Sequence, residues 1–280
     1  MTDTTALYAA LFDDAAMFPP ADLKMPAALR QHARHRLAWY ADTVGPFVCN
    51  ARWLDQLAAQ AQALGLAPLP VAAVVSDGIG ELGRLRARLA GLTQVSLQAL
   101  EVPLKNASLP AAMSALEPFV AGGVPCYLEV PVGAVDDRTV HDLGRARLRL
   151  KLRTGGTSID AFSSEAHLAV PIVACAAERL QFKCTAGLHN AVRHRDEATG
   201  FEHHGFLNVA LAARVAAATG NAAATAAVLA DTDPLSVQSQ VRALTDRDVA
   251  AVRAMFCSFG TCSIDEPIAD LVAMGLVTAR

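Results

Sequence analysis

Short runs of apolar and β-branched residues recur along the chain, separated by Ala- and Leu-rich stretches with helical spacing. Strands are expected at 46–50, 70–75, 95–103, 125–130, 148–154 and 180–185, with a weaker candidate at 255–260. Helices are expected between them, at 51–64, 78–90, 108–121, 135–144 and 163–179. This alternation is typical of right-handed βα units around a parallel sheet.

The expected fold class is α/β, a TIM-barrel-like (βα)8 fold over a single domain, 1–280. An open doubly wound sheet is disfavoured, because no glycine-rich phosphate turn follows the first strand and "SDGIGELG" (76–83) matches such a turn only loosely. Residues 205–254 form an Ala-rich helical portion near the C-terminus and predict two to four consecutive helices. One strand is therefore unaccounted for, and a seven-stranded, incomplete barrel is an alternative.

The segment "LFDDAAMFPPADLKMP" (11–26) is expected to be an ordered loop across one end of the barrel. Paired prolines and clustered aspartates oppose regular structure, while Phe12 and Phe18 favour burial. The segment is either a packing arm or a part of the site, in which case Asp13 or Asp14 closes it.

Side chains alternate across a strand, so each run separates into two faces. In "LRLKLRT" (148–154) the leucines share one face, which leaves Lys151 and Arg153 on the other. The same alternation directs Lys183 and Thr185 of "LQFKCT", and Glu129 of "PCYLEV", toward the barrel interior. All five lie near the C-terminal ends of their strands, where barrels of this class carry their active sites.

Charged groups inside a barrel must be paired or solvated. A structural salt-bridge network would use Glu129 to neutralise one base and would leave an excess of two positive charges. An anionic substrate, carboxylate or phosphate, held by Arg153 would account for that excess. The loop "RTGGTSID" (153–160) offers free backbone N–H groups as an anion cradle, or is an ordinary βα turn.

Further polar residues follow these strands. His189 lies four residues after Thr185, while His203, His204 and Asn208 lie at the start of the next helix, where anions are attracted. They are candidate substrate-binding residues. A metal site built from the histidines is not expected, because adjacent histidines rarely both bind metal and no H-x-H or H-E-x-x-H spacing occurs.

Composition narrows the function classes. The net charge of −3 gives no electrostatic footprint for nucleic acid. No apolar stretch is long enough for a membrane span, and the start of the chain does not resemble a secretory signal. The six cysteines form no CxxC pair and are expected to be buried thiols, so a cytoplasmic location is expected. Apolar C-terminal helices, such as "IDEPIADLVAMGL" (264–276), are compatible with a homo-oligomer.

Two resemblances add to these observations. "FKCTAG" (182–187) is similar to the lysine strand of deoxyribose-phosphate aldolases, class I (βα)8 enzymes whose strand lysine forms a Schiff base. That family has a second lysine on the following strand, which this sequence lacks, and Lys151 on the preceding strand is expected to substitute for it. The combination of "LFDDAAMFPP", "KLRTGG", "KCTAGLHN" and "HHGFLNVALAA" resembles a family of uncharacterised bacterial barrel-like proteins, almost end to end.

The resemblance implies a Schiff-base carbon–carbon lyase, aldolase-like, in which Lys183 attacks a small anionic carbonyl metabolite without a cofactor. Burial and like charge from Lys151 and Arg153 are expected to lower the pKa of Lys183. Glu129 would be the general acid or base and Tyr127 an alternative proton donor. Two other functions stay open: an isomerase, lyase or hydrolase that uses the same residues in non-covalent acid/base chemistry, and a non-catalytic small-molecule-binding barrel.

Overall fold

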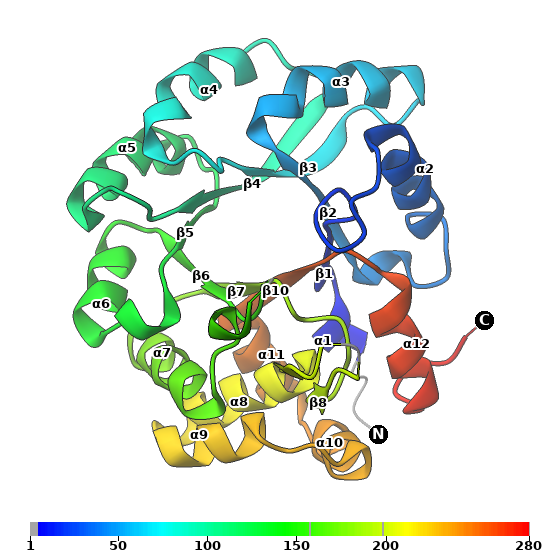
Figure 1. Ribbon diagram of the computed structural model, residues 1–280, viewed down its shortest axis with the longest axis vertical. Coiled ribbons are helices and arrows are strands. Elements are labelled where there is room, and N and C mark those ends of the chain that lie inside the picture. Colours follow the sequence, from blue (N-terminus) through cyan, green and yellow to red (C-terminus); the bar gives the residue numbers. More distant parts are fainter. Residues whose placement is uncertain (1–4, 157, 198, 280) are drawn as a thin grey trace.

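A closed barrel of eight parallel strands forms the centre of the molecule in the computed structural model, which describes residues 5–156, 158–197 and 199–279 (Figure 1). Going around the barrel, each strand pairs with its neighbours in chain order, and the last strand pairs with the first. The strands are β1 Phe12–Asp14, β2 Val44–Asn50, β3 Leu69–Val74, β4 Val95–Pro103, β5 Cys126–Glu129, β6 Arg149–Arg153, β7 Phe182–Thr185 and β10 Phe256–Thr261.

Helices surround the barrel on its outer side (Figure 1). Those that connect or follow single strands are α2 Met25–His35, α3 Leu54–Ala63, α4 Leu82–Leu89, α5 Leu109–Ala121, α6 Asp137–Arg145, α7 Glu165–Glu178 and α12 Asp265–Ala273. Several begin at a side-chain cap, such as Ser108, whose hydroxyl accepts from the backbone N–H of Ala111 at the start of α5. No helix within the described ranges is both long enough and apolar enough to cross a membrane.

The connection from β7 to β10 is the longest in the barrel. It begins with the two-stranded hairpin β8 His194–Arg195 and β9 Glu202–His203. Four helices follow: α8 Phe206–Thr219, α9 Ala222–Leu229, α10 Pro234–Arg242 and α11 Asp246–Met255. The predicted run of consecutive helices over 205–254 is thus confirmed.

The loop expected over 11–26 is wrong at its start, because Phe12–Asp14 forms a barrel strand, β1. Three residues are too short for a periodic pattern to emerge, and the strand is fixed by tertiary packing. The ring of Phe12 packs edge-on against Phe206 and Phe259, with centroids 5.5 and 5.4 Å apart. The strand that the sequence pattern left unaccounted for is therefore β1, which follows the short helix α1 Thr5–Tyr8. With β1 the barrel is complete.

The two faces of the strands divide as alternation predicts. Leu150 and Leu152 of β6, and Phe182 and Cys184 of β7, belong to the large apolar core and are fully buried. A separate, smaller apolar cluster fills the barrel interior and consists of Val48, Ala72, Ala99 and Tyr127. Ala15 and Phe18 pack against this inner cluster. The segment after β1 therefore lies over the lumen.

Candidate functional site

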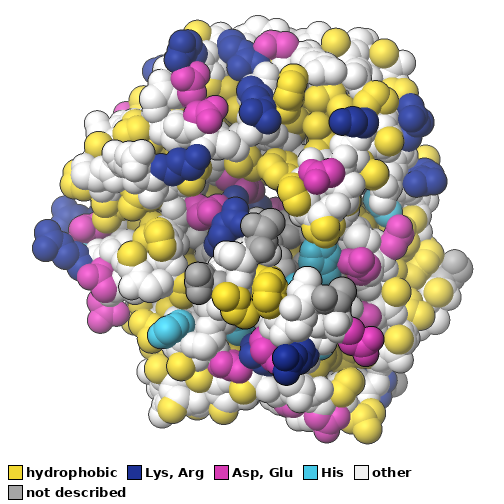
Figure 2. All heavy atoms as spheres, in the orientation of Figure 1, with side chains coloured by type: hydrophobic (Ala, Val, Ile, Leu, Met, Phe, Trp, Pro, Cys, Tyr) yellow, Lys and Arg dark blue, Asp and Glu magenta, His cyan; other side chains and the backbone are white. Residues whose placement is uncertain are grey.

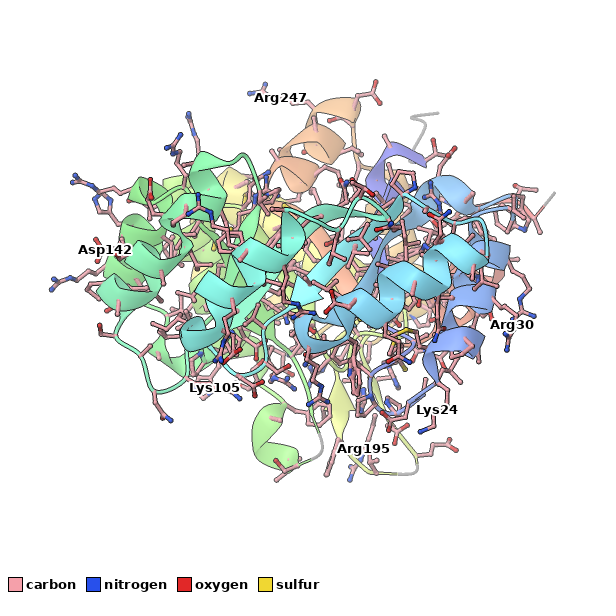
Figure 3. All side chains as sticks on the ribbon, turned by 90° about the horizontal axis from the view of Figure 1, so that it is seen from above. Lys24, Arg30, Lys105, Asp142, Arg195 and Arg247 are labelled. Atoms are coloured by element: carbon pink, nitrogen blue, oxygen red, sulfur yellow. The ribbon has the colours of Figure 1, made fainter. Side chains whose placement is uncertain are left out.

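The loops that follow the C-terminal ends of the barrel strands lie on one side of the barrel. Lys24, Lys105 and Arg195, each in a segment that follows a barrel strand, lie on the same side in Figure 3, whereas Arg247 lies on the opposite side. Figure 2, which looks along the barrel in the orientation of Figure 1, has acidic and basic side chains around a hollow near the centre of this face. Charged groups thus gather at the C-terminal end of the barrel.

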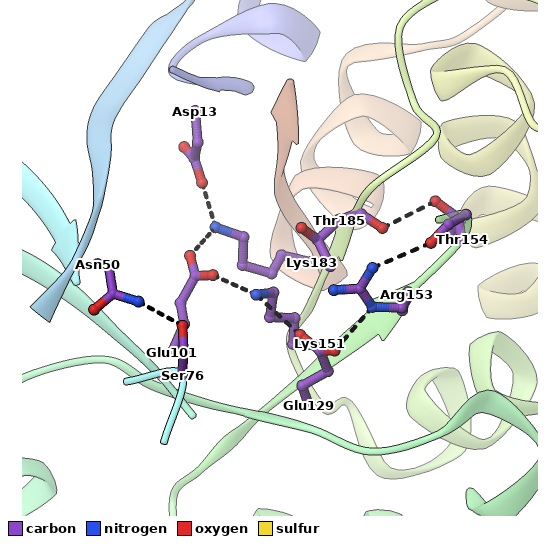
Figure 4. A network of polar contacts seen from close by, with 11 residues as sticks. Asp13, Asn50, Ser76, Glu101, Glu129, Lys151, Arg153, Thr154, Lys183 and Thr185 are labelled. Carbon is purple, nitrogen blue, oxygen red and sulfur yellow. Dashed lines mark hydrogen bonds and ion pairs between the residues drawn. The ribbon is translucent and has the colours of Figure 1, made fainter. Parts of the chain in front are cut away.

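Inside this end, acidic and basic side chains alternate in one continuous network (Figure 4). The ammonium group of Lys183 contacts Asp13 on one side and lies 2.5 Å from Glu101 Oε1 on the other. The other oxygen of Glu101 lies 2.7 Å from Lys151 Nζ. Because every charge has an opposite neighbour, the network satisfies the requirement for burying ions. In order, its members are Asp13, Lys183, Glu101, Lys151, Glu129 and Arg153.

The far end of the network reaches solvent. Glu129 accepts from Lys151 Nζ at 3.1 Å and from Arg153 Nε at 3.1 Å. The side chain of Arg153 is 49% exposed, while that of Lys183 is 2% exposed. Arg153 also donates to the backbone oxygen of Gly155 at 3.3 Å. Arg153 is therefore the most exposed member of the network.

Two of the three acids in the network, Asp13 and Glu101, are not among the lysine partners that strand alternation predicts. The expected excess of two positive charges is wrong, because Asp13 and Glu101 balance Lys183 and Lys151. Glu101 lies on β4 within "VSLQALEVP", for which the sequence pattern predicts a strand and no site residue. A carboxylate at the C-terminal end of an apolar strand is the same kind of signal that identified Lys183, and applying alternation to this strand would have found it.

The pKa shifts follow from these pairs. Burial alone would raise the pKa of Glu101, but Lys151 and Lys183 outweigh it and lower the value to about 2. Burial alone would lower the pKa of Lys183, but Asp13 and Glu101 raise it overall. The predicted lowering of the Lys183 pKa is therefore wrong, since its nearest charged neighbours are carboxylates.

Asp13 differs from the other acids of the network. Burial raises its pKa, and the attraction of Lys183 offsets this only in part. Its Oδ2 accepts from Lys183 and, at 2.8 Å, from Ser258 Oγ on β10. Its Oδ1 is buried with no hydrogen-bond partner among the described residues. Oδ1 of Asp13 is therefore available to accept a proton, and the raised pKa favours this.

Tyr127 lies beneath the network with its ring 5.4 Å from Lys183 Nζ. Its hydroxyl accepts from Arg149 Nη1 at 3.0 Å, and burial raises its pKa. Thr185 occupies the lumen-facing register between Arg153 of β6 and Gly260 of β10. Its backbone oxygen accepts from Thr154 Oγ1 at 3.3 Å.

The loops after β6 and β7 touch one another. A Cβ added to Gly155 would lie 2.9 Å from the Cα of Gly187, so both glycines are required by close approach. The loop predicted as an anion cradle, 153–160, includes residue 157, which lies outside the described residues.

Asp14 does not face the lumen. As the residue after Asp13 on β1, it points to the helix side and lies with Oδ2 2.9 Å from Nδ1 of His32 on α2. Its other oxygen accepts from the backbone N–H of Ala16 at 3.1 Å. Of the two aspartates expected to close the site, the structure brings Asp13 to Lys183.

Three residues expected near the substrate lie among other partners. His204 donates from Nε2 to the backbone oxygen of Ser163 at 2.7 Å, and burial lowers its pKa to about 4. Asn208 is fully buried and accepts from the backbone N–H of Arg193 at 2.8 Å. The ring of His203 packs 4.7 Å from that of Phe162. None of these three contacts the charged network.

His189 lies nearer the mouth, on the loop after β7. Its Nδ1 is 2.7 Å from Glu266 Oε2 on α12. Within the described residues, no group of three or more metal-ligating side chains has a geometry that could hold an ion.

A cavity of about 540 Å³ opens at the opposite end of the barrel, away from the charged network. Its lining includes Arg145 and Arg179, at the C-terminal ends of α6 and α7. Basic residues there stabilise the negative ends of the helix dipoles, which is a structural role.

Comparisons with known proteins agree with the barrel. An aldolase called QR15 superimposes with a TM-score of 0.52 at 11% identity, over 97% of this chain and 98% of its own. A muconate cycloisomerase from Azorhizobium caulinodans gives 0.44 at 11% identity, over 91% of this chain and 55% of its own. A dihydropteroate synthase from Xanthomonas albilineans gives 0.44 at 10%, over 98% and 95%. Neither the protein-family models nor the curated proteins searched include a match to the sequence. The first of these likenesses supports the fold alone.

Proposed function

We propose that the protein is an aldolase-like carbon–carbon lyase that acts on a small anionic carbonyl compound through a Schiff base on Lys183. The observation that carries the proposal is the place of Lys183, buried between Asp13 and Glu101 at the C-terminal end of a (βα)8 barrel. A primary amine at this place is the group that forms a Schiff base with a carbonyl.

A Schiff base requires a neutral amine, so the ammonium of Lys183 must first lose a proton. Asp13 is the acceptor that best fits this role, because burial raises its pKa whereas the pKa values of Glu101 and Glu129 are lowered. The proton passes along the existing Lys183–Asp13 contact. Lys183 Nζ then attacks the carbonyl carbon. The carbonyl oxygen takes one proton from Nζ and the other back from Asp13, and it leaves as water while the protonated Schiff base forms.

The remaining members of the network have supporting roles. Cleavage of the carbon–carbon bond next to the protonated Schiff base leaves its electron pair on the enamine, and Glu129 removes the hydroxyl proton of the departing fragment. Arg153, half exposed at the mouth, binds the carboxylate or phosphate of the substrate. Lys151 holds Glu101 and Glu129 ionised. Because Lys183 is buried and the segment carrying Ala15 and Phe18 packs against the inner cluster, this segment would have to move for a substrate to reach Nζ.

The test is reductive trapping. The protein is incubated with a panel of small keto acids, aldehydes and their phosphorylated forms together with cyanoborohydride, and the intact mass and labelled peptide are measured. We expect an adduct on Lys183 that is absent in Lys183→Arg and retained in Lys105→Arg, an exposed control on the loop after β4. If a panel member is turned over and no adduct forms on any lysine, the covalent mechanism is rejected.

A second candidate function is non-covalent acid/base catalysis by an isomerase, lyase or hydrolase. The raised pKa of Lys183 supports it, because an ammonium group stabilises a developing oxyanion and donates protons without a covalent bond. Under this mechanism Lys183→Arg keeps ligand binding and loses turnover. A ligand that stabilises the protein against heat and is never converted would instead support a non-catalytic binding barrel.

A further inference from the structure

A cysteine, a histidine and a glutamate meet at the mouth of the barrel, outside the charged network. Cys262 follows β10 directly, and His189 lies on the loop after β7, the strand beside β10. The sulfur of Cys262 is 3.9 Å from Nε2 and 4.0 Å from Nδ1 of His189. The sulfur lies at nearly equal distances from both ring nitrogens, so the positive charge of a protonated imidazole would lie beside it.

Helix α12 fixes the imidazole in this position. Glu266, in the first turn of α12, lies with Oε2 2.7 Å from His189 Nδ1. Asp270, one turn further, accepts from the backbone N–H of Ala191 at 2.8 Å and from Asn190 Nδ2 at 3.2 Å. The same helix thus holds both the ring of His189 and the loop that carries it.

The surroundings favour a cationic His189. Burial alone would lower its pKa, but the hydrogen bonds with Cys262 and Glu266 raise it to about 9. His203 on β9 also interacts electrostatically with His189, and burial lowers the pKa of His203. His203 is therefore largely neutral at pH 7 and does not oppose the positive charge.

The other cysteines have different environments. Burial raises the pKa of Cys49, Cys126, Cys175 and Cys184, which keeps those thiols protonated. Cys257 is more exposed than Cys262, its sulfur lies 3.7 Å from the backbone oxygen of Met255, and it interacts electrostatically with Tyr127 and Arg253. Cys257 is therefore a control for exposure within the same molecule.

We infer that Cys262 and His189 form a thiolate–imidazolium pair oriented by Glu266, which makes Cys262 a reactive thiol at the mouth that is modified by small electrophiles and by peroxides. Thiolates are the nucleophilic form of cysteine, and an adjacent cation stabilises them. This site is separate from Lys183 and does not depend on the function proposed for the barrel.

With a peroxide the reaction balances without a further reactant. The thiolate of Cys262 attacks one peroxide oxygen and the O–O bond breaks, which gives a sulfenic acid and hydroxide. The sulfur loses two electrons and the peroxide gains them. The hydroxide takes the proton of the imidazolium and leaves as water, so His189 ends the step neutral.

The test compares alkylation rates of individual cysteines in the native protein. Iodoacetamide labelling is followed by peptide mass spectrometry between pH 6 and 8. For an ordinary thiol with a pKa of about 8.5 the rate falls about 80-fold over this range, because the thiolate fraction falls by that factor. We expect the labelling rate of Cys262 to fall several-fold less between pH 8 and 6 than the rate of Cys257.

Two variants show whether the imidazole is the cause. His189→Asn should restore the steep pH dependence at Cys262 and leave Cys257 unchanged. Glu266→Gln, which keeps the size of the side chain and removes its charge, should give an intermediate profile and covers the case in which His189→Asn does not fold. In parallel, hydrogen peroxide followed by dimedone should label Cys262 and give no product in Cys262→Ser.

The inference is overturned if Cys262 in the wild-type protein has the same steep pH dependence as Cys257, or if it is not labelled under native conditions. A flat profile that persists in a folded His189→Asn variant also overturns it, because the imidazole would then not be the stabilising group.

Discussion

Asp13 and Lys183 are separated by 170 residues and form a buried ion pair inside the barrel. The pair joins β1 to the charged side chains of the later strands, although β1 is only three residues long. Both side chains are almost fully removed from solvent. The contact therefore links closure of the barrel to assembly of the candidate site.

Removing the ammonium group should strongly destabilise the fold. In Lys183→Met the carboxylates of Asp13 and Glu101 lose their shared buried partner, and breaking a buried ion pair costs about 3–5 kcal/mol. Urea unfolding measures the change. Lys105→Met, at an exposed site, should change the free energy of unfolding by less than about 0.5 kcal/mol. A Lys183→Met variant as stable as this control would contradict the burial of the pair.

Gly45 on β2 leaves room for Asp13. A Cβ at this position would lie 2.2 Å from Asp13 Oδ1, so the carboxylate must move or the strands must separate. We expect Gly45→Ala to destabilise the protein by about 1–3 kcal/mol, as overpacking does. Gly83→Ala in α4 is the matched control, because nothing lies within 4 Å of its added Cβ, and it should be neutral or slightly stabilising. Thermal unfolding of the two variants distinguishes these outcomes.

The neighbouring aspartates of β1 should separate function from stability. Asp13→Asn removes the proton acceptor of Lys183 and should abolish the adduct trapped by cyanoborohydride. Asp14→Asn weakens the contact with His32 on the outer face and should lower the melting temperature while adduct formation persists. Measuring both properties in both variants gives the comparison. Loss of the adduct in Asp14→Asn at temperatures where it is folded would contradict the assignment.

Much of the barrel could be predicted because its strands are apolar on their outer face, and because β5, β6 and β7 carry charged residues on their inner face. Alternation within 148–154 and 180–185 was enough to direct Lys151 and Lys183 into the same lumen, where they stand opposite each other in register. The boundaries of β4 were predicted without error, since nine residues give a clear pattern.

The sequence could not reveal which charges would meet. Asp13 lies in a strand too short to recognise, so its partner 170 residues away was not predictable from local pattern. Without Asp13 and Glu101, the lysines were interpreted as mutually repelling and the direction of the Lys183 pKa shift was wrong. For His203 and His204 the sequence predicts a substrate contact that the structure does not show. A residue at a helix start can attract anions, but it can also simply be packed, as His204 is.

His204 gives a prediction about pH. Burial lowers its pKa in the folded state to about 4, against an ordinary value of 6.5, so the unfolded chain binds an extra proton between these values. Stability is therefore lost as the pH falls from 6.5 toward 4, by an amount on the order of 3 kcal/mol from this residue. His204→Gln cannot titrate but can still donate to Ser163. Urea unfolding at several pH values should give a shallower slope for the variant than for the wild type over this range, since the carboxylates titrate in both. Parallel slopes would mean that His204 is already protonated or exposed in the folded protein, which its full burial against Ser163 and Arg193 opposes.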